Sequence, residues 1–151
     1  ADRPALMAGP ASRGLARFIK TWVDAVINPA IIPIIVADII DDVAAGDEAH
    51  FRTTREARFG CRLEDVCGDL AGRLDAFRKT LTPARLTLQT QPFLSGGQVG
   101  YADYILFGTF QWAAFTSDIQ LLEADDAIYA WRERLLDLFG GYGRKGPGVS
   151  G

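Results

Sequence analysis

Hydrophobic residues recur every three or four positions along most of this chain, which is the spacing of amphipathic helices. The segment 12–27 places four large apolar side chains on one helical face: Leu15, Phe18, Trp22 and Val26. Asn28 and Pro29 then predict a bend or an end, because proline lacks a donor and its ring clashes with the preceding turn. A second helical run is predicted over residues 30–43.

The same spacing predicts further helices in the middle and at the end of the chain. Residues 47–60 form a predicted helix with Asp47 as its N-cap and Gly60 as a left-handed C-cap. A long one-sided helix is predicted over 63–91, with a bend near Pro83. The last predicted helix covers about 125–139, and the stretch "PFLSGGQVG" is typical of a turn.

The segment 100–115, "GYADYILFGTFQWAAF", is apolar on every side and predicts a central helix surrounded by others. Gly100 is its expected N-cap, and the carboxylate of Asp103 is expected to accept from the Gly100 N–H, which gives half of a capping box. Phe107 and Phe110 are expected in the core. Gly108 predicts the close approach of another helix backbone, because a mid-helix glycine otherwise costs about 1 kcal/mol.

No alternating strand pattern with hairpin signals occurs in the sequence, so the predicted fold class is all-α, a bundle of about five to seven helices. The expected organisation is a linker-like segment over 1–11, a helical domain over 12–141 and a loose tail over 142–151. The apolar run 25–37 is shorter than the roughly 18 residues that cross a bilayer, so we expect no membrane span.

The net charge and the cysteine spacing argue against several classes of function. The 151 residues carry a formal charge of −3 and a pI near 5.1, which argues against a nucleic-acid-binding surface. Cys61 and Cys67 are six apart, a spacing that fits neither a redox pair nor a metal motif. Together with the lack of a secretory leader pattern, they favour a cytoplasmic location.

Three motifs resemble the C-terminal helical domain of glutathione S-transferases, in particular the bacterial and fungal branch with the β-aryl-etherase-like enzymes. The turn and helix "QPFLSGGQVGYADYILFGTFQWA" is similar to that domain's central segment, although Gly100 stands where the family usually has a hydroxyl cap. The segment "DDAIYAWRERLLDLFGGYGR" resembles its final helix, and "DRPAL" resembles the link from the preceding domain.

The resemblance implies a partner domain with a thioredoxin-like fold, which in the family binds the co-substrate glutathione and carries the catalytic residue. It also implies a homodimer and a hydrophobic small-molecule substrate. Since no such domain precedes "ADRPAL" here, the chain alone is not expected to conjugate glutathione, and whether it is an enzyme stays open. The alternative is a stand-alone helical module that binds a protein or an apolar ligand without catalysis.

The resemblance also suggests which side chains meet the hydrophobic substrate. The candidates come from the first helix and the central helix: Phe18, Trp22, Val23, Ile27, Trp112 and Phe115. Simple core packing is the competing interpretation for each of them. Arg13 and Arg17 are candidates for a glutathione or dimer contact, with a solvated helix face as the alternative. His50 is expected at the surface, Asp103 is interpreted as a structural cap, and neither a catalytic residue nor a metal site is predicted.

Overall fold

The computed structural model describes residues 6–7, 9–41, 47–60, 62 and 68–145. These residues form α-helices, one π-helical turn and one 3₁₀ turn, and the described part contains no strand beyond an isolated bridge between Phe93 and Gly96. The all-α prediction is therefore confirmed. The elements are α1 (Pro10–Trp22), η1 (Val23–Ile27), α2 (Asn28–Asp41), α3 (Glu48–Phe59), α5 (Leu70–Thr80), α6 (Thr82–Leu88), α7 (Tyr101–Thr116), α8 (Ala127–Gly141) and η2 (Tyr142–Arg144).

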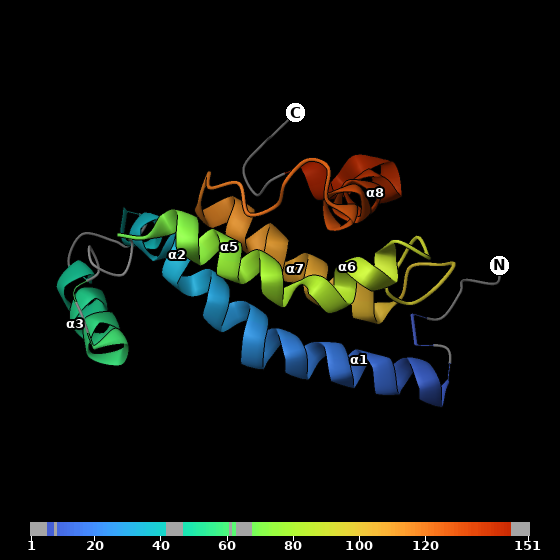
Figure 1. Ribbon diagram of the computed structural model, residues 1–151, viewed down its shortest axis with the longest axis horizontal. Helices are drawn as coiled ribbons and strands as arrows, with labels where there is room; N and C mark the ends of the chain where they lie inside the picture. The colour runs from blue at the N-terminus through green and yellow to red at the C-terminus, as the bar shows by residue number, and fades with distance from the viewer. Residues whose placement is uncertain (1–5, 8, 42–46, 61, 63–67, 146–151) are drawn as a thin grey trace.

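The first three elements join into one long helical rod, which runs along one side of the molecule (Figure 1). The helix does not end at Pro29, because helical backbone geometry continues through Asn28 and into α2, but the run changes direction between α1 and α2 (Figure 1). The π-helical turn Val23–Ile27 lies directly before the proline. Such a wider turn relieves the contact between a proline ring and the carbonyl four residues earlier, here that of Ala25.

By length and composition, the helical run Pro10–Val36 could cross a membrane, because an 18-residue window of it has a mean hydropathy of 1.5. The earlier expectation considered residues 25–37 alone, whereas the structure joins them to α1. Core helices of soluble proteins meet the same criterion, so the run is a weak indication. Its side chains Ile19, Ile27 and Ile31 lie in the hydrophobic core.

The other helices pack around this rod. α7 lies against α1, η1 and α2, while α5 packs on α2 and η1, and α8 packs on α6 (Figure 1). α3 lies beside α2 at the far end of the rod. α3 begins after Asp47 and ends at Gly60, whose φ of 70° is left-handed, as predicted. The predicted long helix over 63–91 is instead two helices divided at Leu81; residues 63–67 lie outside the described part.

Three aromatic rings form the centre of the core, where α5, α7 and α8 meet. Phe77, Phe110 and Trp131 are each at most 2% exposed. Phe110 stands edge-to-face with both others, with ring centroids 6.4 Å from Phe77 and 6.3 Å from Trp131. Such pairs contribute roughly 0.5–1.5 kcal/mol beyond their buried area. Phe107 is half-buried and contacts Trp131, so α7 faces α8 through both of its predicted core phenylalanines.

Two arginines fasten α5 and α6 to the loop before α8. Arg85 donates from Nε and one terminal nitrogen to the Asp126 carboxylate, at 3.1 and 2.7 Å. Arg78 donates to the Leu121 carbonyl at 3.0 Å and to Glu123 at 2.7 Å. Asp126 also caps α8 by accepting from Ile128 N, so one carboxylate both starts the last helix and holds it to α6.

The regular part of α8 ends earlier than its full span. Leu138 is extended, with ψ at 152°, and Phe139 and Gly140 adopt left-handed conformations, with φ of 53° and 68°. The chain then folds back through the turn Tyr142–Arg144. Residues 142–145 contain this turn, and residues 146–151 lie outside the described part.

Candidate functional site

A groove of about 500 Å³ runs between the rod and α7, and it is the first candidate site. We call it the α1–α7 groove. It is lined by Lys20, Val23, Asp24, Asn28, Ile32, Tyr101, Ile105, Gly108, Thr109 and Trp112. On α7 the lining residues recur at steps of three and four, which places them on one helical face. The groove is of the size that small ligands occupy in proteins.

The π-helical turn η1 supplies part of the wall of the α1–α7 groove. Val23 and Asp24 line it, and Asn28 follows directly after the turn. Single π-helical turns within α-helices occur frequently at functional sites, because the extra residue redirects the side chains that follow. This local widening is the feature of the rod that most favours a functional role for the groove.

An exposed ion pair stands at the edge of the α1–α7 groove. Lys20 donates to the Asp24 carboxylate at 2.5 Å, one helical turn away. This hydrogen bond and the charge of Asp24 raise the pKa of Lys20 above its ordinary value. The two side chains are 65% and 55% exposed, so the pair contributes little to stability and remains available to an incoming polar group.

The α7 face of the groove differs from the prediction. Among the described residues, no neighbouring atom lies within 4 Å of where a Cβ on Gly108 would be, so none of the described helices brings its backbone close to it. Tyr101 and Trp112 on the same face are 41% and 40% exposed. The expectation that other helices surround α7 is therefore wrong for this face, because the described helices cover only its remaining sides.

The predicted substrate contacts lie on several different surfaces. Phe18 on α1 is 65% exposed, and Trp22 is partly buried against the core. Val23 and Trp112 both line the α1–α7 groove, while Ile27 is fully buried in the core. Phe115 is 51% exposed and lines the neighbouring cavities at the end of α7.

Arg13 and Arg17 lie on an exposed part of α1, and His50 is exposed on α3. In the described part of the chain, no group of three or more His, Cys, Asp or Glu side chains could hold a metal ion. Cys61 and Cys67 lie outside the described residues.

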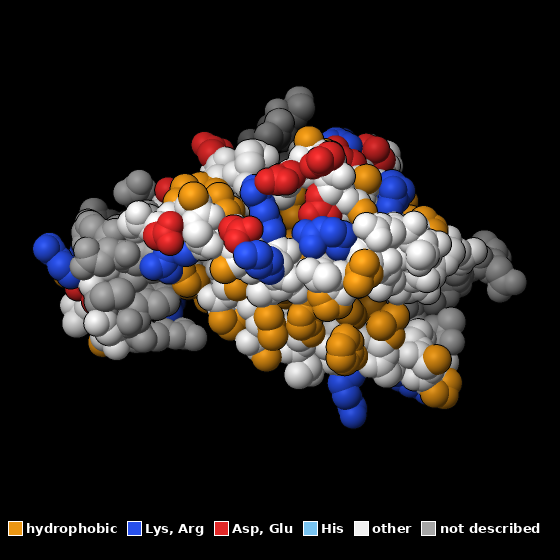
Figure 2. Space-filling model, in the orientation of Figure 1, with side chains coloured by type: hydrophobic (Ala, Val, Ile, Leu, Met, Phe, Trp, Pro, Cys, Tyr) orange, Lys and Arg blue, Asp and Glu red, His pale blue; other side chains and the backbone are white. Residues whose placement is uncertain are grey.

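Hydrophobic side chains also gather over α1 on the side that faces α5 and α6 (Figure 2). Exposed apolar residues on these elements are Phe18 and Val26 on the rod and Leu86 on α6, with exposed fractions of 65%, 38% and 59%. Charged side chains instead concentrate over α5 and α8 in the same view. The rod thus presents apolar surface on both sides, toward α7 and toward α5–α6.

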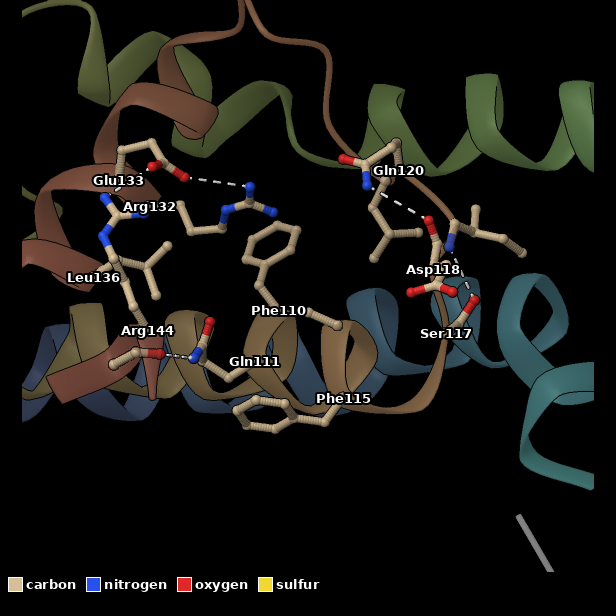
Figure 3. Close-up of a pocket in the computed structure, with 14 residues that line it drawn as sticks. Phe110, Gln111, Phe115, Ser117, Asp118, Gln120, Arg132, Glu133, Leu136 and Arg144 are labelled. Atoms are coloured by element: carbon tan, nitrogen blue, oxygen red, sulfur yellow. Dashed lines mark hydrogen bonds and ion pairs between the residues drawn. The ribbon is translucent and has the colours of Figure 1, made fainter. Parts of the chain in front are cut away.

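A second cavity, of about 380 Å³, lies between the C-terminal half of α7, the loop after it, and α8 (Figure 3). We call it the α7–α8 pocket. Phe110, Leu121 and Leu136 give it apolar walls. Figure 3 shows Arg132, Glu133 and Arg144 on one side and Ser117, Asp118 and Gln120 on the other. The sequence motifs did not point to this cavity, because its two sides come from segments about twenty residues apart.

The 3₁₀ turn η2 closes one end of the α7–α8 pocket. Gln111 of α7 donates to the Gly143 carbonyl at 2.8 Å. Arg144 donates to Asp137 at 2.7 Å and to Glu133 at 2.9 Å, and these bonds raise its pKa, with Asp137 the larger cause. A Cβ on Gly143 would lie 3.3 Å from a methyl group of Leu136, so this turn is packed closely against α8.

The loop on the other side of the α7–α8 pocket is tied to the rod. Ser117 donates to the carboxylate of Asp38 at the end of α2, and its hydroxyl accepts from Ile119 N at 3.1 Å. Ser117 is 8% exposed. These bonds hold the loop after α7 in place, so both walls of the pocket are fixed by polar contacts.

Asp103 is fully buried at the start of α7 and accepts four hydrogen bonds. Its Oδ1 accepts from Leu94 N at 2.6 Å and Trp131 Nε1 at 2.9 Å, and its Oδ2 accepts from Gly100 N at 3.0 Å and Ser95 N at 3.2 Å. The Gly100 contact is the half capping box expected from the sequence. The carboxylate therefore joins the turn, the start of α7 and the middle of α8.

Steric crowding by Ser95 explains why a glycine is favoured at the N-cap of α7. A Cβ on Gly100 would lie 2.7 Å from the Cβ of Ser95, closer than real side chains approach. The side chain of Ser95 thus occupies the space that a hydroxyl cap at position 100 would need.

The sequence was compared with models of protein families. The family described as "Glutathione S-transferase, C-terminal domain" matches residues 14–134, from within α1 to about the middle of α8.

Proposed function

Because the chain belongs to the glutathione S-transferase C-terminal domain family, we propose that it is the substrate-side domain of a glutathione-dependent transferase. In this proposal, glutathione and the catalytic residue belong to a thioredoxin-like domain that docks on this chain. The observation that carries the proposal is the α1–α7 groove. It lies between the π-helical turn η1 and an uncovered, largely apolar face of α7.

The chemistry of the groove fits a hydrophobic substrate. Val23, Ile105 and Trp112 supply apolar contact surface, and Lys20 and Asp24 supply polar groups at its edge. Large aromatic side chains such as Trp112 bind apolar molecules with little loss of conformational entropy. Phe18, Trp22 and Phe115 lie outside this groove and would reach a substrate only where the docked domain extends the site.

The uncovered glycine supports the docking part of the proposal. Gly108 lacks the close helix contact that usually offsets its cost of about 1 kcal/mol in a helix. A domain seated on the α1–α7 groove would provide that contact. The second apolar surface, over α1 toward α5–α6, is then available for a homodimer contact. Arg13 and Arg17 share the helical face of Lys20 and Asp24, so in this proposal they are candidates for a glutathione contact near the α1–α7 groove.

The finer assignment, to the β-aryl-etherase-like branch, rests on the motif resemblances alone. Under that assignment the complete enzyme would cleave an aryl ether with glutathione rather than conjugate an aryl halide. A cytoplasmic location belongs to the same proposal. The competing function, a non-catalytic helical module for a protein or apolar ligand, would use the same exposed apolar surfaces.

The test compares the 151-residue chain with the product of the complete coding sequence. We expect the chain alone to show no glutathione conjugation with 1-chloro-2,4-dinitrobenzene, and the complete product to show conjugation or ether cleavage. Gly108→Leu should lower kcat/KM of the complete product at least about tenfold, because it fills the groove. Gly14→Leu is the matched control, since Gly14 is also a helical glycine with open space around it.

The outcomes separate the hypotheses. Equal losses in the Gly108→Leu and Gly14→Leu products would show that the groove has no special role. A complete product without a thioredoxin-like domain and without glutathione-dependent activity would overturn the enzyme proposal. In that case, light scattering of the chain with and without candidate partners would test the non-catalytic module.

A further inference from the structure

Arg132 is the less well paired of the two arginines in the α7–α8 pocket. Within the described residues, its hydrogen-bond partner is Glu133, and that contact is long, at 3.4 Å. Its Nε is buried without a partner. Arg144 in contrast makes contacts of 2.7 to 2.9 Å with Asp137 and Glu133. Because Nε is shielded, a ligand acceptor would meet the terminal N–H groups of Arg132, for which Glu133 is a distant partner.

The position of Arg132 suits a planar anion. Its guanidinium carbon lies 4.9 Å from the ring centroid of Tyr129, so one face of the group rests on an aromatic ring. This stacking orients the guanidinium and leaves its N–H edge for hydrogen bonds, the arrangement in which arginine recognises carboxylates. The side chain keeps 18% exposure and lines the pocket, so a ligand in the pocket can reach it.

The charges around the α7–α8 pocket limit the charge of that anion. Arg132 and Arg144 carry two positive charges, and Glu133 and Asp118 carry two negative ones, so these four lining side chains sum to zero. A dianion such as a phosphate ester would meet two nearby carboxylates with no surplus positive charge. A single carboxylate needs only the poorly paired guanidinium.

Part of the remaining pocket wall is apolar, and part is formed by the polar side chains of Gln111, Ser117 and Gln120. Phe110, Leu121 and Leu136 line it, and each is at most 9% exposed. A volume of about 380 Å³ is within the range of small-molecule sites. The pocket therefore places the guanidinium of Arg132 near the edges of three apolar side chains.

We propose that the α7–α8 pocket binds a small aromatic monocarboxylic acid, with its carboxylate on Arg132 and its ring against Phe110, Leu121 and Leu136. Two other buried Nε atoms without partners, those of Arg73 and Arg134, do not line this pocket. The proposal does not depend on the glutathione-linked function, because the pocket shares no lining residue with the α1–α7 groove.

The test uses isothermal titration of the full chain at pH 7.5 with three probes that share one ring system. We expect 2-naphthoate to bind with a Kd below about 1 mM. The neutral 2-naphthalenemethanol and the dianionic 2-naphthyl phosphate should each bind at least about tenfold more weakly. Absence of naphthoate binding, or equal or tighter binding of either other probe, would overturn the carboxylate assignment.

Two variants locate the site. Arg132→Gln should weaken naphthoate binding at least about tenfold, whereas Lys79→Gln, at an exposed cation on α5 outside the pocket, should leave it unchanged. Ala114→Phe adds a ring at an exposed helical position that lines the pocket, and it should also weaken binding at least about tenfold. Thermal unfolding followed by circular dichroism verifies that each variant folds. If Arg132→Gln does not fold, the naphthoate affinity of Ala114→Phe tests the location of the site. Binding that survives in the folded variants would place the ligand elsewhere and overturn the proposal.

Discussion

Replacing Asp103 with asparagine tests the central polar contact of the fold. Asparagine has nearly the same shape, but one carboxylate oxygen becomes an NH₂ group. In either orientation of the amide, that group faces two N–H donors, because Oδ1 accepts from Leu94 and Trp131 and Oδ2 accepts from Ser95 and Gly100. The variant therefore loses two charge-assisted hydrogen bonds and leaves two donors without acceptors.

The expected loss follows from these contacts. A hydrogen bond to a charged group contributes about 1.5–3 kcal/mol, so the loss of two should lower the free energy of unfolding by about 3–6 kcal/mol. That is a large share of the roughly 5–15 kcal/mol that stabilises a typical domain. With urea slopes of about 1–3 kcal/mol/M, the unfolding midpoint should fall by about 2 M.

The assay is urea unfolding followed by circular dichroism and by tryptophan fluorescence, since Trp131 is itself a partner of Asp103. Asp75→Asn is the control, because Asp75 is a 67% exposed carboxylate on α5 that pairs with Lys79. Its unfolding free energy should change by less than about 0.5 kcal/mol. A loss below about 1 kcal/mol for Asp103→Asn would refute the view that this carboxylate holds the turn, α7 and α8 together.

Three further predictions concern α7 and its start. Gly100→Ser should lower the free energy of unfolding by about 1–3 kcal/mol, because the side chain of Ser95 fills the space that the new side chain needs, although a hydroxyl cap is usually preferred. In urea titrations, the double variant with Ser95→Gly should regain most of this loss. Gly108→Ala should stabilise the isolated chain by about 0.5–1 kcal/mol, since the added methyl group meets open space; a destabilised variant would contradict this. Burial, and secondarily the charge of Asp103, raises the pKa of Tyr104 above 10.0, so stability is retained below that pH and falls as the pH rises toward the folded-state pKa. Tyr104→Phe should reduce this loss at high pH, and an identical pH profile for both proteins would be evidence against the shift.

Local patterns were sufficient to predict most helices, but not how they cover one another. Asp103 was predicted as a cap because its partner Gly100 is three residues away, whereas Trp131 lies 28 positions along the chain and only folding brings it near. Similarly, Val23 and Phe18 belong to the same amphipathic helix, yet one is 3% and the other 65% exposed. Their exposure depends on where α5 and α7 dock, which the spacing of one helix does not reveal.

The errors have equally specific causes. A helix end was one of the two outcomes expected at Pro29, because single-residue rules do not include a π-helical turn that accommodates the ring. Gly108 was expected beside another helix backbone because a mid-helix glycine is costly, but an apolar helix face can also be covered by a surface outside this chain. The α7–α8 pocket escaped sequence analysis because its polar residues are hydrogen-bonded across α7, α8 and η2 rather than within one motif.

The four donors around Asp103 also determine how this domain comes apart. Leu94 and Ser95 lie in a turn, a place where backbone amides usually open to solvent by small local fluctuations. Here their hydrogens point to a carboxylate that also holds the indole of Trp131, so releasing the turn means removing α8 from the core. The turn, the first turn of α7 and the middle of α8 should therefore open as one cooperative unit. The amides of this surface turn should therefore open to solvent as slowly as those of the hydrophobic core.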